Sequence, residues 1–285
     1  MRKHRRQGIV GVGLWLVLMA GCGPSSLVQG TDTDVDERFH ESMAGHAKDL
    51  DFPLSTTDSF TFLFVSDIHL RPDEDDWMDV LDAYAQNADA AFIVCGGDNT
   101  DRGWLKEYNW YLLRTEGFYA AMYPAIGNHD LYHNGWKHYQ RRLGPSVYSF
   151  EYGNAFFFFL DSAQATLGRD QLDYVERKLK QVTQRHRFVI SHFPIYDGPA
   201  QTPAMMGVPE ERYELIYLFD KYGVEYYLSG HKHSGERYLI RGTWYIIAGA
   251  GATYKDIVGD EPHFWRFDIR GEVIHSEKIY FKDLR

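Results

Sequence analysis

Five short apolar runs in the sequence each end in residue types that bind metal ions. These residues are carboxylates, an amide and imidazoles, namely Asp67, His69, Asp98, Asn128, His192, His231 and His233. Imidazole combined with carboxylate suits zinc, manganese, iron or nickel, and the lack of thiolate in the set argues against a structural zinc site. Seven ligands exceed the needs of one ion, so we expect two ions that lie about 3.5–4 Å apart and share one carboxylate.

The spacing of these residues favours a shared site. Asp67 and His69 are two residues apart, as are His231 and His233, and residues two apart in extended chain project to one side. Each group follows a β-rich run, and open α/β sheets place their sites in the loops beyond the carboxyl ends of strands. Taken singly, each fragment also fits a helix cap or an ordinary turn. Their joint occurrence at successive strand ends favours the functional interpretation.

The elements that must position these residues alternate between strand and helix patterns. Strands are expected at residues 60–65, 90–95, 118–126, 148–152, 155–160, 187–191 and 224–229. Helices are expected at residues 76–86, 104–113, 135–143, 171–182 and 210–222. The C-terminal part has the pattern of strands at 236–241, 243–248, 263–269 and 272–281. Apolar runs separated by helices predict a partly parallel sheet buried by helices, and the strand-rich tail predicts an antiparallel part or a second sheet.

Five motifs of the chain resemble the signature motifs of the calcineurin-like metallophosphoesterase superfamily. They are Asp67-Ile68-His69, Gly96-Gly97-Asp98, Gly127-Asn128-His129-Asp130, His192, and Gly230-His231-Lys232-His233. The resemblance spans residues 60 to about 250, where the segment 246–252 is similar to the glycine-rich strand of many members. It implies an α/β fold, a two-sheet β-sandwich flanked by helices, which agrees with the pattern of elements above.

The resemblance also implies a role for each residue of the motifs. The ligands of a first metal ion would be Asp67, His69 and His233. The ligands of a second would be Asn128, His192 and His231, and Asp98 would bridge the two ions. His129 would be a catalytic residue that binds the phosphate and protonates the leaving oxygen, and Asp130 would orient its ring. Two cations neutralise phosphate oxygens and lower the pKa of a bound water, and they align the resulting hydroxide with the leaving group.

Departures from subfamily patterns narrow the resemblance. Purple acid phosphatases have a tyrosine three residues after the bridging aspartate, where this chain has Asp101, so no tyrosinate-bound iron is expected. The segment 97–103 resembles the Gly-Asp-x-x-Asp-Arg-Gly pattern of Ser/Thr protein phosphatases, in which the arginine contacts phosphate. Two roles are open for Arg102, a substrate-binding contact or a structural ion pair with Asp101. The whole pattern is most similar to small bacterial phosphodiesterase-like and exported phosphatase-like members.

Several residues near the motifs have two interpretations. Tyr132, His133 and Trp136 follow the third motif and either wall the substrate pocket or pack the following helix, and packing is the favoured interpretation. The loop 195–209 follows His192 and is either a substrate lid or a seal over the sandwich. Lys232 lies between two ligands, and alternation predicts that it points away from the metals.

Composition bounds the class of function. The chain has 285 residues, 44% of them hydrophobic, which excludes a disordered or fibrous protein. Its formal net charge of −10 argues against a nucleic-acid-coating protein, which needs a basic face. A small phosphorylated substrate is still compatible, because a metal site supplies local positive charge. The two cysteines, Cys22 and Cys95, cannot form a disulfide framework.

The N-terminus has the pattern of an export signal. Residues 2–6 are basic, residues 8–20 are apolar, and small residues precede Cys22. The stretch resembles a bacterial lipobox, so we expect a signal peptide at 1–21, lipidation of Cys22, a flexible tether at 22–57 and the metallophosphoesterase domain at 58–285. Within the tether, the pattern around residues 36–48 is compatible with a short helix. An uncleaved signal anchor is the alternative. Lipidation would make the protein an exported lipoprotein, anchored to a membrane and facing the periplasm or the cell exterior.

The function expected from the sequence is metal-dependent hydrolysis of a small phosphomonoester or phosphodiester by a dinuclear centre and its bound hydroxide. The ions would be manganese, iron, zinc or nickel. A nuclease with the same metal core is one alternative, and the acidic composition counts against it. A non-catalytic scaffold lipoprotein that kept the fold is another, and the presence of His129 beside a full ligand set counts against it.

Overall fold

The computed structural model describes residues 33–45, 52, 55–71, 76–199, 201–251 and 260–284. The predicted signal peptide at residues 1–21, the predicted lipidation site Cys22 and about half of the predicted tether lie outside the described residues. In the part of the chain that the structure describes, no helix has both the length and the apolar character needed to cross a membrane.

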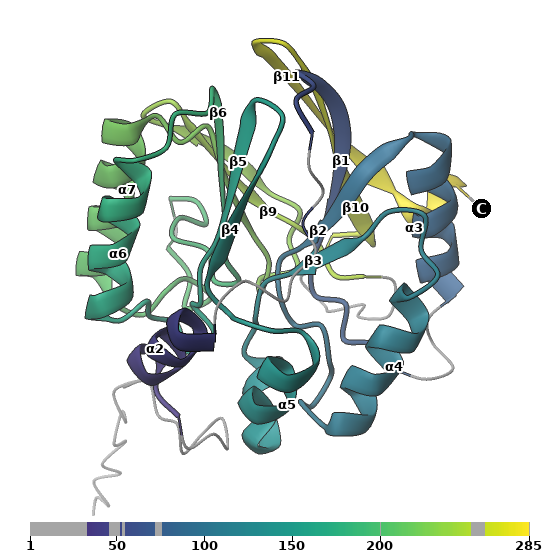
Figure 1. The fold of residues 1–285 in the computed structure, drawn as a ribbon, viewed down its shortest axis with the longest axis horizontal. Helices are drawn as coiled ribbons and strands as arrows, with labels where there is room; N and C mark the ends of the chain where they lie inside the picture. The colour runs from purple at the N-terminus through teal and green to yellow at the C-terminus, as the bar shows by residue number, and fades with distance from the viewer. Residues whose placement is uncertain are drawn as a thin grey trace, which may run out of the picture.

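The first of two mixed sheets has five strands in the order β11-β10-β1-β2-β3 (Figure 1). Their bounds are β1 Ser59–Val65, β2 Ala90–Cys95, β3 Met122–Pro124, β10 His263–Arg270 and β11 Val273–Tyr280. β1, β2 and β3 are parallel, whereas β10 pairs antiparallel with both β1 and β11. The carboxyl ends of β1, β2 and β3 therefore lie at one edge of this sheet.

The second sheet has six strands in the order β4-β5-β6-β7-β9-β8. Their bounds are β4 Tyr148–Tyr152, β5 Ala155–Phe159, β6 His186–Ile190, β7 Tyr226–Ser229, β8 Arg237–Ile240 and β9 Thr243–Ile247. The four central strands are parallel, and antiparallel β4 and β8 form the two edges. The carboxyl ends of β6 and β7 again lie at a common edge.

Aromatic side chains fill the space between the two sheets. The ring of Phe62 stacks on Phe267 with centroids 4.7 Å apart and meets the edges of Phe157 and Phe188 at 5.1 Å each. Alternate residues of β1 face opposite ways, so Phe62 joins this inner core while Leu63 joins the cluster under the helices. Burial on both faces explains why the strands are continuous apolar runs.

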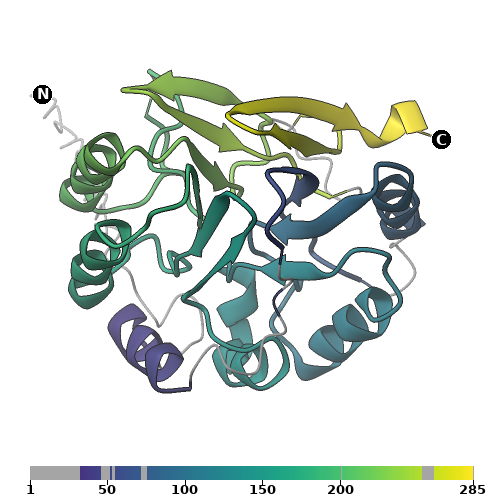
Figure 2. The same ribbon diagram turned by 45° about the horizontal axis from the view of Figure 1, so that its top comes forward.

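Helices cover the outer face of each sheet, as Figures 1 and 2 show. α3 (Asp76–Asn87), α4 (Leu105–Thr115) and α5 (Gly135–Arg142) pack on the first sheet, and the short helix η2 (His129–Asn134) leads into α5. α6 (Arg169–Leu179) and α7 (Pro209–Tyr222) pack on the second sheet. A last short helix, η3, spans Phe281–Leu284. The result is the predicted two-sheet architecture flanked by helices.

An additional helix, α2 (Val35–Gly45), packs beside α6 within the segment predicted to be a flexible tether (Figure 1). Arg38 of α2 is fully buried, and its guanidinium donates to both oxygens of Asp161, at 2.8 and 3.0 Å. Ser42 Oγ lies 3.1 Å from Ser146 Oγ. Residues 35–45 therefore belong to the folded body, which corrects the predicted start of the body at residue 58.

Every predicted strand and helix has a counterpart in the structure, with one marked difference in length. The strand predicted over 118–126 is only Met122–Pro124 in β3. The strand begins four residues later than predicted, and its pairing with β2 continues to Ala125, whose backbone N–H donates to the carbonyl oxygen of Cys95 at 2.7 Å.

Candidate metal centre

The predicted ligands of a first metal ion form a buried cluster. Asp67 and His69 follow β1, and His233 follows β7 of the other sheet, so the cluster joins the two sheets. The ligand atoms of these three residues all lie within 4.8 Å of one another, and His233 Nε2 is 3.1 Å from Asp67 Oδ1. The backbone N–H of His231 donates to both carboxylate oxygens of Asp67, at 3.0 Å each, which fixes the orientation of that carboxylate.

The predicted ligands of a second ion form a neighbouring cluster. The ligand atoms of Asp98, His192 and His231 lie within 4.8 Å of one another, and Asn128 Oδ1 is 3.0 Å from His192 Nε2. His192 Nδ1 lies 3.0 Å from the carbonyl oxygen of Gly96, to which it can donate. That contact sets the ring so that Nε2 faces the cluster, the usual arrangement of a histidine that binds metal.

Asp98 lies between the two clusters. Its Oδ2 atom is 3.6 Å from His69 Nε2 on one side and 3.3 Å from His192 Nε2 on the other. Its Oδ1 atom accepts a hydrogen bond of 2.8 Å from the backbone N–H of His129. One oxygen is thus held by the backbone and the other points between the clusters, the position that a bridging carboxylate requires.

The backbone of the ligand loops differs from the extended chain that we predicted. Five ligands have positive φ angles in the left-handed region, namely Asp67, His69, Asp98, His231 and His233. Residues other than glycine rarely adopt this conformation, and each instance costs about 1–3 kcal/mol and persists only where the surrounding structure enforces it. The prediction that Asp67 and His69, and His231 and His233, lie close together is therefore correct. The predicted cause, alternation along an extended chain, is wrong, because the backbone of these loops is left-handed at the ligands.

The ionisation of the carboxylates reflects these neighbours. Burial by itself raises the pKa of Asp67, but the nearby His233 and His192 hold that pKa below its ordinary value. Burial likewise opposes ionisation of Asp98, yet His192 and the other rings around it hold the pKa of Asp98 well below its ordinary range. Both carboxylates are therefore ionised and can act as ligands at neutral pH.

Burial and nearby charge shift the pKa values of three ligand histidines, His69, His231 and His192, in two directions. Burial lowers the pKa of His69 to about 4 and that of His231 to about 3, so both rings are neutral and have a lone pair for a metal. Burial also disfavours charge on His192, but Asp98 overrides it and raises the pKa of His192 to about 9. Asp98 therefore stabilises a proton on the ring of His192, and a metal ion bound there would have to displace that proton.

The donor set fits two transition-metal ions. It combines imidazole nitrogens, carboxylate oxygens and one amide oxygen, the mixture that suits zinc, manganese, iron or nickel. Asp98 lies within reach of the histidines of both clusters, so two bound ions would each have their own ligands and could share this carboxylate.

His129 lies beside this centre and is partly exposed. Its ring centroid is 4.4 Å from that of His69, and a nitrogen of the ring lies within 4.8 Å of the ligand atoms of His69 and Asp98. His129 Nδ1 is 2.7 Å from the carbonyl oxygen of Asp101, to which it can donate. This contact orients the ring and leaves Nε2 as the nitrogen that can exchange a proton with a substrate.

Asp130 has a different position from the one expected. It does not hold the ring of His129, which contacts the Asp101 carbonyl instead. The buried carboxylate of Asp130 accepts hydrogen bonds from the backbone N–H groups of Gly127, Asn99 and Thr100 and from the side chains of the latter two, at 2.9–3.2 Å. Burial and the charge of Asp98 raise its pKa to about 6. Asp130 therefore joins the loop that carries Asp98 to the loop that carries Asn128.

Arg102 lies at the exposed edge of the site. Its side chain is 58% exposed, and its Nε atom is 3.5 Å from Asp101 Oδ2. Arg71 makes the closer contact with Asp101, since its Nη2 atom lies 2.8 Å from Oδ1. The ion pair of Arg102 is thus loose, and both roles considered for this residue are compatible with its position.

Three features near the motifs, Lys232, the loop 195–209 and Trp136, lie outside the clusters of candidate ligands. Lys232 points away from the clusters, as predicted, because its Nζ atom contacts Glu236 Oε2 at 2.7 Å and the carbonyl oxygen of Asp197 at 3.1 Å. In the loop 195–209, Ile195 and Met206 are buried in the cluster between the second sheet and helices α6 and α7, so these two residues have a packing role. Trp136 is buried and packs α5, also as favoured.

Sequence reasoning missed the supports that hold the ligand loops from behind. Ser162 Oγ is 2.6 Å from Ser191 Oγ and accepts a hydrogen bond from the backbone N–H of Phe193, so it contacts both neighbours of His192. Ser162 follows Asp161, the partner of Arg38. The ring of Phe193 lies 3.8 Å from that of His231. The available signal was the pair of polar residues Asp161 and Ser162 just after β5. Their partners are remote in sequence, so the contacts could not be predicted.

Comparisons with known proteins agree with this geometry. Residues 60–235 match the family model described as calcineurin-like phosphoesterase. The fold is similar to that of GAP50, described as the anchor in the inner membrane complex of Plasmodium, with a TM-score of 0.64 and 15% identity over 80% of this chain and 87% of that chain. No curated protein matches the sequence significantly.

Two further solved structures have a similar fold. A dimetal phosphatase from Danio rerio gives a TM-score of 0.60 at 13% identity, over 79% of this chain and 100% of that chain. PhoD gives a TM-score of 0.59 at 12% identity, over 81% of this chain and 67% of that chain. At these identities the likeness concerns the fold alone.

Proposed function

The chain belongs to the calcineurin-like phosphoesterase family, and on that premise we propose that it hydrolyses a small phosphomonoester or phosphodiester at a two-metal centre outside the cytoplasm. The family and the clusters of His and Asp make it a phosphoesterase of the hydrolase class. The observation that carries the two-metal proposal is Asp98, because its Oδ2 atom lies between His69 Nε2 and His192 Nε2.

Each residue of the site has a task in this reaction. Asp67, His69 and His233 would hold one ion, Asn128, His192 and His231 the other, and Asp98 both. When bound, the two cations supply charge neutralisation for the phosphate oxygens and an activated water.

His129 donates a proton to the leaving oxygen in the proposed reaction. Its Nδ1 atom is held by the carbonyl oxygen of Asp101, so proton transfer uses Nε2. Asp130 keeps the loops of Asp98 and Asn128 in register, so it is a positioning residue and has no contact with the reacting atoms.

The composition favours a small substrate over a nucleic acid. A chain with a net charge of −10 lacks the basic balance with which proteins bind the phosphate backbone of DNA or RNA. A non-catalytic scaffold is disfavoured because His129 lies beside a full set of ligands. The remaining candidates are small esters such as nucleotides, sugar phosphates and phosphorylated headgroups.

Turnover of a panel of esters tests the proposal. The protein is stripped of metal by chelation and reloaded with manganese, zinc, iron or nickel, and hydrolysis of monoesters and diesters is measured for each metal. We expect turnover of at least one ester class that returns on reloading and is accompanied by two ions per chain in elemental analysis. A reloaded protein that holds two ions and hydrolyses none of the esters would contradict the proposed function.

We also propose that the protein is exported and anchored to a membrane by a lipid at Cys22. The support is the sequence pattern of residues 1–22. Cys22→Ser should abolish incorporation of labelled palmitate in a bacterial host. Full incorporation in this variant would contradict lipidation at Cys22, and mature protein that still begins with Met1 would indicate a signal anchor.

A further inference from the structure

A surface of aromatic and cationic side chains begins at the open side of His129. We call this surface the rim and define it by its residues, which are Arg102, Trp104, Lys106, Tyr132 and His133. Arg102, Lys106 and His133 are exposed, and Trp104 and Tyr132 are half-buried. The rim is formed by two segments, residues 102–106, which run from a loop into the first turn of α4, and the η2 turn that carries His129.

Ring contacts lead from the metal centre into the rim. The rings of His69 and His129 have centroids 4.4 Å apart, and those of His129 and Tyr132 are 4.7 Å apart. In the outer part of the rim, the ring of Trp104 lies 5.3 Å from that of His133. Each ring is therefore within contact distance of a neighbour, and the adjacent residues Tyr132 and His133 connect the inner part to the outer part.

Two cations flank the ring of Trp104. The Nζ atom of Lys106 lies 4.4 Å from the centroid of this ring, and the guanidinium carbon of Arg102 lies 5.6 Å from it. Distances under 6 Å are those of cation–π contacts, which hold the two basic groups near each other despite their like charge. Positive charge is thus concentrated at the outer end of the rim.

The acidic residues nearest to these cations are largely committed to other partners. Asp101 makes its closer ion pair with Arg71, at 2.8 Å, and its contact with Arg102 is 3.5 Å. Glu107 is buried, and its Oε2 atom accepts hydrogen bonds from the backbone N–H groups of Arg102 at 2.9 Å and Trp104 at 3.2 Å. These contacts leave the exposed head groups of Arg102 and Lys106 directed to solvent in a chain that is acidic overall.

The backbone fixes the position of the rim relative to His129. The Asp101 carbonyl contacts His129 Nδ1 at 2.7 Å, and the Arg102 carbonyl contacts His133 Nδ1 at 3.0 Å. Gly103 has a φ of +69°, and a Cβ atom there would lie 2.4 Å from the carbonyl oxygen of Tyr132. The two segments are therefore packed backbone against backbone, and α4 and α5 that follow them lie side by side (Figures 1 and 2).

We infer that the rim binds the leaving group of the substrate, and that this leaving group carries a second anionic group. The inference rests on the proposed function, in which His129 protonates the leaving oxygen. The part of the substrate beyond that oxygen must then extend past His129, where the ring of Tyr132 can contact its body and the ring of Trp104 holds the two cations in place. Arg102 and Lys106 offer charge to an anion at its far end, which is a carboxylate or a second phosphate.

A matched pair of ester series tests the inference. One series consists of alkyl phosphates of graded chain length that end in a carboxylate, and the other has the same chains ending in a carboxamide. The two end groups have the same shape and differ in charge, and the scissile bond is unchanged. We expect the carboxylate esters to have a kcat/KM about 10-fold higher at the chain length that reaches the cations, the usual worth of one hydrogen bond to a charged group.

Three variants locate the effect. Arg102→Met and Lys106→Met should each lower the ratio of carboxylate to carboxamide kcat/KM toward one. Arg237→Met is the matched control, because the guanidinium of Arg237 lies 3.9 Å from the ring of Trp244 on the β8–β9 hairpin and is not part of the rim. The control should keep the full ratio. High salt should lower the ratio in the wild type, since both cations are exposed.

Several outcomes would overturn the inference. A wild type with equal kcat/KM for both series at every chain length has no anion subsite in its leaving-group region. A ratio that survives both rim substitutions places the anion elsewhere. If Arg102→Met lowers both series equally, Arg102 contacts the transferred phosphate and does not recognise the leaving group.

Calorimetry separates this inference from the proposed function. The phosphonates that correspond to the two ester series cannot be hydrolysed, so their binding is measured without turnover. If the phosphonate that ends in a carboxylate binds more tightly than the one that ends in a carboxamide, and Lys106→Met abolishes this difference, the rim binds the anion even if no ester is hydrolysed. Equal binding of the two phosphonates, together with hydrolysis of both ester series, overturns the rim and leaves the proposed function intact.

Discussion

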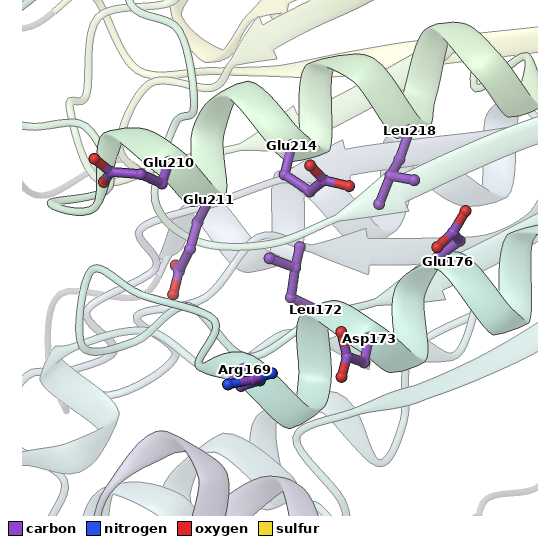
Figure 3. Close-up of a pocket in the computed structure, with 8 residues that line it drawn as sticks. All are labelled: Arg169, Leu172, Asp173, Glu176, Glu210, Glu211, Glu214 and Leu218. Carbon is purple, nitrogen blue, oxygen red and sulfur yellow. The ribbon is translucent and has the colours of Figure 1, made fainter.

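The metal centre and the groove between α6 and α7 both concentrate acidic side chains, but the two regions are constructed differently. The groove has a volume of about 320 Å³ and is lined by Arg169, Leu172, Asp173, Glu176, Glu210, Glu211, Glu214 and Leu218 (Figure 3). Its lining contains no imidazole, whereas the metal centre combines imidazoles with carboxylates. Figure 3 shows the acidic side chains spread along two helices, without convergence on one point.

The carboxylates of the two regions also differ in burial and in partners. Asp67 and Asp98 are each 1% exposed, and backbone N–H groups hold their oxygens in place. In the groove, Glu210 and Glu214 are exposed, and Glu176 pairs with the exposed Lys221. Within the described part of the chain, the groups of His, Cys, Asp and Glu that are close enough to hold an ion all belong to the metal centre. Negative charge in a groove is therefore not sufficient for a cation site. The carboxylates must also converge on one point and be shielded from water.

The largest effect should come from neutralising the shared carboxylate. Asp98→Asn removes a charged ligand from both clusters at once, so we expect kcat/KM to fall by roughly 10³-fold or more. Elemental analysis should show one ion per chain or none. Asp173→Asn, the same chemical change in the groove, is the control and should keep full metal content. An Asp98→Asn protein with two ions per chain would refute the bridging role.

The next largest effect should separate proton transfer from metal binding. His129→Ala should keep both ions and lower kcat by roughly 10²–10⁴-fold, the usual contribution of a positioned acid. The loss should be greatest for alkyl phosphates, whose leaving groups are strong bases, and least for aryl phosphates, which need little protonation. Equal losses for both kinds of ester would assign His129 to phosphate binding, and loss of metal would make it a ligand.

The sequence predicted much of the site because strand ends are a local signal. Asp67, Asp98, Asn128, His192 and His231 each follow an apolar run, and parallel strands bring such ends to a common edge. The two-metal grouping followed from residue types and from family resemblance, without any knowledge of distances.

Features that depend on remote contacts escaped sequence reasoning. The partner of Arg38 is Asp161, which lies 123 positions away, so the folded role of α2 had no local signature. The carboxylate of Asp130 serves Asn99 and Thr100 from a loop that is adjacent only in space. The left-handed backbone of the ligands could not be predicted from the sequence either. It is imposed by the packing of the loops, against the preference of residues such as His69 and Asp98 for negative φ angles.

The contrast between buried and exposed charge should also hold for ion pairs outside the metal centre. Arg38→Met leaves the buried carboxylate of Asp161 without its cation, so the free energy of unfolding should fall by about 3–5 kcal/mol in urea titrations. Lys221→Met, which breaks the exposed pair with Glu176 beside the groove, should change stability little. Equal changes in the two variants would show that burial does not decide the strength of these pairs.

The smallest effect should come from neutralising the groove itself. The double variant Asp173→Asn with Glu214→Gln removes two exposed negative charges that have water as an alternative partner, so the free energy of unfolding should stay within about 0.5 kcal/mol of the wild type. Turnover and metal content should also be unchanged, because these side chains lie on α6 and α7 and belong to none of the clusters of the metal centre. If the wild type binds a further cation in elemental analysis and the double variant loses it, the exposed carboxylates of the groove converge in solution, and the distinction drawn between the two acidic regions fails.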